Sequence, residues 1–166
     1  TWIAQQWLGE CIFAFIHRLA GLDGLLVLAV SLISILYAFL SSKIERSGMN
    51  LMLGSLLLAF SLAAASHNLH VRPHLFTMFF MAVLYSKLCD IDMQRSRELS
   101  LFWLIPFFII WVNIHGGVLG GLCTLLIAVA GWTLTCPLEL HSPFRTAKSV
   151  FMLWGLTLLC LLTIFI

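Results

Sequence analysis

Two short polar segments interrupt an apolar chain and hold four of its six histidines. The Arg72 segment, residues 67–74 (HNLHVRPH), carries three histidines and one arginine, and the His115 segment, residues 113–117 (NIHGG), carries the fourth histidine. A guanidinium keeps its charge and has planar donors that match a phosphate or carboxylate. Imidazoles can bind anions or metals and can transfer protons. We therefore expect the two segments to face each other and to line one polar site.

The composition is that of an integral membrane protein. Hydrophobic residues make up 61% of the 166 residues and charged residues only 10%, whereas about a quarter of the residues in soluble domains are charged. The mean hydropathy is +1.05. The five cysteines are scattered singly, which is typical of small buried side chains and not of a disulfide framework. Membrane lipids are the expected surroundings, and we expect no nucleic-acid partner.

The apolar runs predict an all-α fold, a polytopic transmembrane bundle of about six spans. Residues 1–21 precede it as an extracytoplasmic amphipathic helix that lies in the membrane interface and ends at Gly21. Residues 22–166 form the transmembrane domain, and we expect the chain to be a fragment truncated at both ends. Pro73 should begin the third span, and Pro106 should kink the fourth. The predicted spans are 22–42, 51–66, 73–89, 101–112, 118–135 and 150–166.

Alternating spans sort the charges in the way that the positive-inside rule requires. One side receives seven cations, which are Lys43, Arg46, Lys87, Arg95, Arg97, Arg145 and Lys148, and the other receives only Arg18 and Arg72. Five histidines then fall on the extracytoplasmic side, namely His17, His67, His70, His74 and His115. The second and fourth spans are short, about 24 and 18 Å at ~1.5 Å per residue. We therefore expect both polar segments to be recessed in a cavity that opens to the outside.

Each polar group has a second interpretation. Arg72 binds an anionic ligand such as a lipid phosphate, or it caps helix carbonyls or pairs with Glu10 or Asp23. Gly116 and Gly117 expose N–H groups at a helix start as an anion seat, or they only allow a tight helix break. The histidines hydrogen-bond to backbone or headgroups, or they hold a divalent metal; the candidate ligands for such a metal are His67, His70, His74 and His115.

Four motifs carry a resemblance to a known superfamily. They are WLGE at 7–10, LAGLDGL at 19–25, RPHLF at 72–76 and WVNIHGG at 111–117. In this order and spacing they resemble a group of bacterial multi-pass proteins similar to the GT-C glycosyltransferases, the superfamily of protein mannosyltransferases and aminoarabinose transferases. The resemblance implies an enzyme of the bacterial cytoplasmic membrane that takes a sugar from a polyprenyl-phosphate donor at the extracytoplasmic face.

The resemblance also implies a catalytic acidic residue on a first extracytoplasmic loop, most of which precedes this chain. Residues 2–19 resemble the closing helix of that loop, so Glu10 is the nearest acidic candidate. Gln5 and Gln6 stand where related sequences often carry a His-Glu pair.

The leading hypothesis assigns each polar residue a role. Arg72 holds the lipid-linked phosphate, and Asn113, Gly116 and Gly117 shape the pocket. Phosphate or acceptor is oriented by three histidines, His70, His74 and His115. The alternatives are a membrane transporter or channel that uses the cavity for a metal or an anion, and a non-catalytic membrane subunit.

Overall fold

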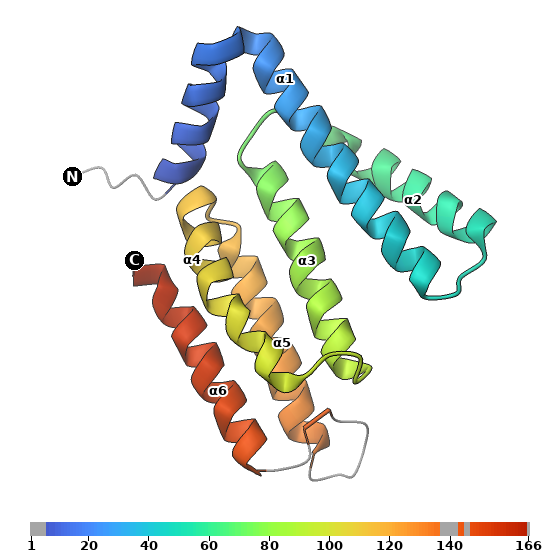
Figure 1. The fold of residues 1–166 in the computed structure, drawn as a ribbon, viewed down its shortest axis with the longest axis vertical. Helices are drawn as coiled ribbons and strands as arrows, with labels where there is room; N and C mark the ends of the chain where they lie inside the picture. Colours follow the sequence, from blue (N-terminus) through green and yellow to red (C-terminus); the bar gives the residue numbers. More distant parts are fainter. Residues whose placement is uncertain (1–5, 137–142, 145–146, 166) are drawn as a thin grey trace. The chain divides into compact units, whose positions relative to one another are not determined.

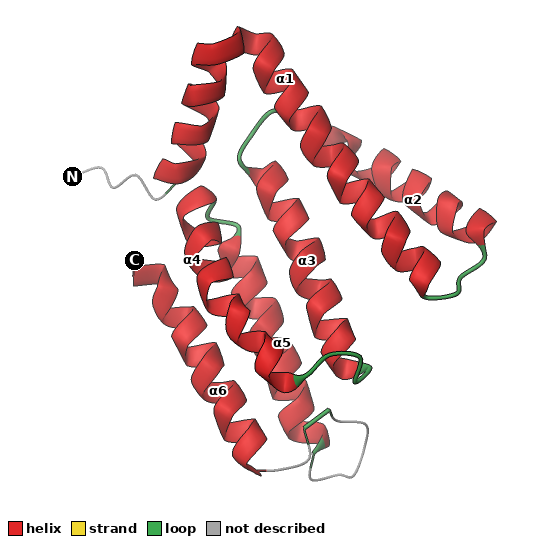
Figure 2. Cartoon of the chain, in the orientation of Figure 1, coloured by secondary structure: helices red, strands yellow, loops and turns green. Residues whose placement is uncertain are grey.

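All regular structure in the described part of the chain is helical. The structure is a computed structural model that describes residues 6–136, 143–144 and 147–165 (Figures 1 and 2). It confirms the all-α class. The elements in chain order are α1 (Trp7–Arg46), α2 (Leu51–Ala65), the 3-10 helix η1 (Ser66–Asn68), α3 (His74–Asp92), the 3-10 helix η2 (Glu98–Trp103), α4 (Leu104–Ile114), α5 (Val118–Thr135), α6 (Ala147–Leu162) and the 3-10 helix η3 (Thr163–Phe165).

Four helical stretches are long and apolar enough to cross a membrane. They are α1, α3, α5 and the stretch Lys148–Phe165, which joins α6 to η3. Two further apolar helices are shorter, α2 and the stretch Leu99–Ile114 formed by most of η2 with α4. These four helices support the multi-pass character predicted from composition. The two further, shorter helices coincide with the second and fourth predicted spans.

The chain forms two compact units, which we describe separately. The N-terminal unit is Leu8–Ala82, and the C-terminal unit is Thr1–Trp7 together with Val83–Ile166. The Arg72 segment belongs to the first unit and the His115 segment to the second.

In the N-terminal unit, α1 is bent where the sequence predicts a helix end. Ala20 and Gly21 leave the helical region, and Gly21 has a φ of 60°, a left-handed conformation that glycine adopts without steric cost. Figure 1 shows the bend. The break at Gly21 is thus confirmed, although the helical segments on its two sides form one 40-residue element. The interfacial position of the first of these segments stays a prediction.

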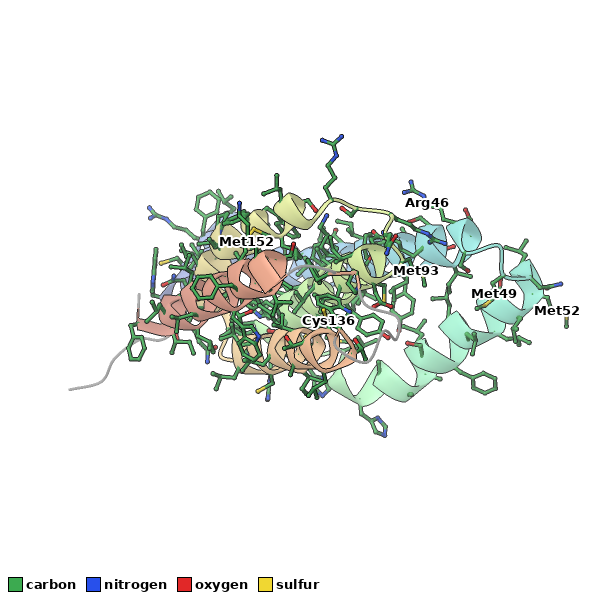
Figure 3. The ribbon with its side chains drawn as sticks, turned by 90° about the horizontal axis from the view of Figure 1, so that it is seen from below. Arg46, Met49, Met52, Met93, Cys136 and Met152 are labelled. Atoms are coloured by element: carbon green, nitrogen blue, oxygen red, sulfur yellow. The ribbon has the colours of Figure 1, made fainter. Side chains whose placement is uncertain are left out.

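The second part of α1 and α2 form a hairpin. Gly54 packs against Ile44, and the hydroxyls of Tyr37 and Ser61 are 3.3 Å apart. Asn50 caps α2, because its side chain accepts a hydrogen bond from the N–H of Met52 at 2.9 Å. Arg46, Met49 and Met52 surround this turn (Figure 3). The other face of α2 is exposed and almost wholly apolar, which suits a helix surrounded by lipid or by other apolar segments.

The C-terminal unit holds the best-packed core. Helices α4, α5 and α6 lie side by side (Figure 1). Phe108 and Trp111 of α4 are fully buried and stack with their rings 5.7 Å apart at 8°. Gly121 of α5 faces this pair, so the two helices approach closely at a position without a side chain. Leu125 and Val129 continue the buried face of α5.

Two local predictions differ from the structure. The third span begins at His74 and not at Pro73, which lies in the preceding turn. The fourth span has no break at Pro106, because this residue lies in the first turn of α4, where the missing N–H of a proline costs little. The irregularity in that span comes earlier, where 3-10 helix η2 changes to α-helix at Leu104.

Candidate functional site

The Arg72 segment is the irregular connection between α2 and α3. It starts in η1, whose first residue, Ser66, donates its hydroxyl to the Ala63 carbonyl at 2.7 Å. It ends where the N–H groups of Leu75 and Phe76 donate to the carbonyls of Arg72 and Pro73, both at 3.1 Å. The backbone of Arg72 thus helps to start α3. Its side chain is exposed.

The guanidinium of Arg72 makes no hydrogen bond or ion pair with any residue in the described ranges. Glu10 and Asp23 were the acidic partners that the sequence offered, and both are exposed side chains of the same unit that do not contact it. The interpretation of Arg72 as half of an intrachain ion pair is therefore wrong for the described residues. A charge left unpaired next to apolar helices is expensive unless water or an anionic group meets it.

The three histidines of the Arg72 segment differ in their surroundings. His67 and His70 are exposed, and His74 is half-buried as the first residue of α3. Throughout the described residues, no group of three or more His, Cys, Asp or Glu side chains is arranged to hold a metal ion. The divalent-metal interpretation therefore gains no support from this geometry.

The His115 segment is a tight connection between α4 and α5. His115 leaves the helix with φ −160° and ψ 138°. Its Nδ1 atom accepts a hydrogen bond from the N–H of Gly117 at 3.0 Å. Val118, Leu119 and Gly120, the first three residues of α5, donate their N–H groups to the carbonyls of residues 115, 116 and 117 at 3.2, 3.3 and 3.1 Å.

These bonds change the expectation for Gly116 and Gly117. An anion seat at a helix start needs N–H groups that have no other acceptor. Here the N–H of Gly117 and those of the first three residues of α5 all have acceptors within the turn. The interpretation of the two glycines as part of a tight helix break fits this geometry better than an anion seat.

Asn113 is held at both ends of its amide group. Its nitrogen donates to the Ile109 carbonyl at 2.8 Å, and its oxygen accepts a hydrogen bond from the Trp7 indole at 2.5 Å. Asn113 therefore joins Trp7 to the end of α4 within the C-terminal unit. Sequence reasoning missed this role, because nothing in a local pattern links residues that lie 106 positions apart.

A hollow lies elsewhere in the C-terminal unit, between α3 and α5, and encloses about 250 Å³. It is open and mostly apolar, and at one end the Trp132 indole donates to the Asp92 carboxylate at 2.7 Å. The hollow extends toward the C-terminal ends of the two helices, whereas His115 precedes the N-terminal end of α5. Its lining residues are Tyr85, Leu88, Cys89 and Asp92 from α3 and Thr124, Ile127, Ala128 and Trp132 from α5.

This hollow was not expected, although the spacing of its residues offers a signal. Positions 85, 88, 89 and 92 share one face of a helix, as do 124, 127, 128 and 132. The cavity that we expected between the two polar segments stays a prediction, because Arg72 and His115 belong to different units. Glu10 is an exposed residue of α1 in the N-terminal unit.

No protein-family model, curated protein or solved structure matches this chain.

Proposed function

We propose that the chain is the membrane region of a GT-C-like glycosyltransferase. It binds a polyprenyl-phosphate-linked sugar on the extracytoplasmic side of a bacterial cytoplasmic membrane. The observation that supports this most directly is Arg72, an exposed guanidinium between two apolar helices that has no partner among the described residues. The motif resemblance supplies the reaction, and the arginine supplies the group that meets the phosphate.

A phosphate is the ligand class that this arginine fits best. The guanidinium presents paired donors in one plane, and a phosphate accepts them as two parallel hydrogen bonds. A lipid-linked phosphate also brings its own apolar chain, which partitions next to helices such as α2, whose Leu51, Met52 and Phe60 are at least 70% exposed. Headgroup and tail would then both find surroundings of matching polarity.

The exposed histidines near Arg72 add further hydrogen-bond donors. His70 lies two residues before the arginine and His67 five residues before it, and neither imidazole is bonded to another described residue. In this proposal His70 and His74 orient the phosphate or the acceptor. Glu10 is the acidic candidate of this chain for activating the acceptor.

The test is transfer of labelled sugar from a polyprenyl-phosphate donor by the full-length protein. Arg72→Gln should reduce donor binding roughly ten- to hundredfold, because a charge-assisted hydrogen bond is worth about 1.5–3 kcal/mol. Arg72→Lys should keep part of the binding, since it keeps the charge and loses the planar fork.

Arg18→Gln is the matched control. Arg18 is also an exposed arginine of the N-terminal unit without a described partner, so its loss changes net charge equally. Equal effects of the Arg18 and Arg72 substitutions would show a general charge effect and would remove Arg72 from the site. Ion or solute flux through proteoliposomes without any sugar transfer would instead favour the transporter.

A further inference from the structure

The hollow between α3 and α5 is long and narrow. Its lining runs from Tyr85 to Asp92 on α3 and from Thr124 to Trp132 on α5, a length of about 10–12 Å at ~1.5 Å per residue. A volume of about 250 Å³ over that length gives a cross-section of roughly 20–25 Å². A helix with its side chains is about 10–12 Å across and does not fit, whereas a single extended hydrocarbon chain does.

The depth of the hollow matches the region where lipid chains begin. α3 and α5 are both long and apolar enough to cross a membrane, and Asp92 is the last residue of α3. A polar turn follows at residues 93–97 (MQRSR). The hollow thus starts at the end of a membrane-length helix and extends toward its middle. An apolar surface left empty at this depth loses its dispersion contacts, and a lipid chain that enters the hollow restores them.

Two exposed arginines lie in the turn at the same end of α3. The N–H of Arg95 donates to the Asp90 carbonyl at 2.8 Å, so the turn folds back on the last turn of the helix. The side chains of Arg95 and Arg97 are both exposed. The Asp92 carboxylate at this end of the hollow already accepts the Trp132 indole N–H. We propose that the hollow holds one acyl chain of an anionic phospholipid, whose phosphate binds Arg95 and Arg97.

Both parts of the lipid are needed for this binding. Acyl chains are already in apolar surroundings in a bilayer, so the hydrophobic effect alone does not favour the hollow. The fit of the chain adds dispersion contacts, and planar guanidinium donors match a phosphate. The hollow and these arginines belong to the C-terminal unit, whereas Arg72 belongs to the N-terminal unit. The inference therefore does not depend on the proposed function.

Cys89 lines the hollow and reports on its occupant. The full-length protein that keeps only this cysteine is placed in detergent micelles with a rising fraction of phosphatidylglycerol, and its reaction with N-ethylmaleimide is followed. We expect the rate to fall severalfold and then to level off as the hollow fills. Cys123 alone is the matched control, because it is exposed on α5 and does not line the hollow. Its rate should not change.

Three results of this experiment would overturn the inference. The first is a Cys89 rate that phosphatidylglycerol does not change. The second is equal slowing at Cys123, which would show only that lipid covers the helices in general. The third is protection of Cys89 that rises with protein concentration and not with phosphatidylglycerol, which would assign the hollow to a second copy of the chain.

The phosphate part is tested with the same cysteine. Dioleoylglycerol has the same chains without a phosphate, so it should not give saturable protection. Arg95→Gln together with Arg97→Gln should raise the phosphatidylglycerol fraction for half-maximal protection roughly tenfold. Arg46→Gln is the charge control, because Arg46 is an exposed arginine of the other unit. Equal protection by dioleoylglycerol, or no effect of the double substitution, would overturn the role of the arginines.

The chain part is tested by filling the hollow. Ala128 lines it, so Ala128→Leu should remove one bound phosphatidylglycerol from the protein in native mass spectrometry. Ala130→Leu is the control, because Ala130 is on the same helix outside the lining. Undiminished lipid on a folded Ala128→Leu variant would refute the hollow as the site. If that variant does not fold, the protection of Cys89 in the parent sequence still decides the inference.

Discussion

Gly121 is the position where a single added methyl group should cost the most. A Cβ built on this glycine would lie 2.5 Å from Cη2 of Trp111, closer still to its Cζ3, and 3.3 Å from Cε1 of Phe108. Trp111 is 0% exposed and stacks on Phe108, which is also 0% exposed, so neither ring has room to move. In Gly121→Ala, α4 and α5 must therefore separate, or the rings must leave their rotamers.

The neighbouring glycine provides the reference for the magnitude. A Cβ on Gly120 would meet nothing within 4 Å, so Gly120→Ala gains the helix preference of alanine, up to about 1 kcal/mol, without a clash. Gly121→Ala has the same gain in helix propensity, but overpacking destabilises it, typically by about 1–3 kcal/mol. The difference between the two variants cancels the propensity term. We expect Gly121→Ala to be less stable than Gly120→Ala by about 1–3 kcal/mol.

The assay is equilibrium unfolding in mixed detergent micelles, followed by circular dichroism. The clash involves Cζ3 and Cη2, at the outer edge of the Trp111 indole, which reaches farther from the backbone than a phenylalanine ring. In a Trp111→Phe background, the cost of Gly121→Ala should therefore fall by about 1 kcal/mol or more, as a double-mutant cycle would measure. Equal stability of the two alanine variants would refute the close packing of α4 on α5 at Gly121.

Three further predictions concern hydrogen bonds whose partners are far apart in the chain. Trp132→Phe should lower the free energy of unfolding by about 1–3 kcal/mol, because it removes the indole N–H that donates to the part-buried Asp92 carboxylate. Asp92→Asn keeps an acceptor for that N–H, so it should lower the free energy of unfolding by less. Asn113→Leu and Trp7→Phe should each lower the free energy of unfolding, and their double-mutant cycle should give a coupling energy of about 0.5–3 kcal/mol. Additive effects would mean that the two side chains do not form a hydrogen bond. Tyr37→Phe should change stability by less than about 0.5 kcal/mol, because its long hydrogen bond is exposed, and a larger loss would contradict that geometry.

Helix positions followed from the sequence where local signals agree. The bounds of α5, Val118–Thr135, are those predicted, because two glycines precede an uninterrupted apolar run. The bend of α1 was located at Gly21, since only glycine readily takes the left-handed conformation found there. The change of helix type before Pro106 was not foreseen, because a proline within an apolar run signals a break without saying on which side it falls.

The partners of polar groups were much less predictable. The sequence left Arg72 open between an anionic ligand and a pair with Glu10 or Asp23, and only the structure shows that those pairs do not form. The bond of Asn113 to Trp7 and that of Asp92 to Trp132 depend on which helices meet, which periodicity does not encode. The bond from Gly117 to His115 spans two residues and was within reach of local reasoning, since an acceptor side chain before a helix is a known cap.

Helix lengths also decide whether Arg72 and His115 can reach one site. α2 has 15 residues and η1 has three, and α4 has 11 and η2 has six. Each α-helix with its 3-10 extension therefore reaches at most about 28 Å, at ~1.5 and ~2.0 Å per residue, against a hydrocarbon layer of about 30 Å. The 3-10 turns bring both short helices close to the length that a crossing requires.

If both short helices cross, the Arg72 and His115 segments lie on one side of the membrane, opposite the turn after α1. If only α4 fails to cross, or if both fail, the two segments lie on opposite sides and cannot share a ligand.

Single cysteines at His67, Gly116 and Ser47, each in a background without native cysteines, would decide on which side of the membrane each segment lies. Gly116 suits the test because nothing lies within 4 Å of a Cβ there. A thiol reagent that does not cross membranes should label His67→Cys and Gly116→Cys in intact cells and leave Ser47→Cys unlabelled until the cells are opened. Labelling of the first two from opposite sides would refute the shared site, whatever else the chain resembles.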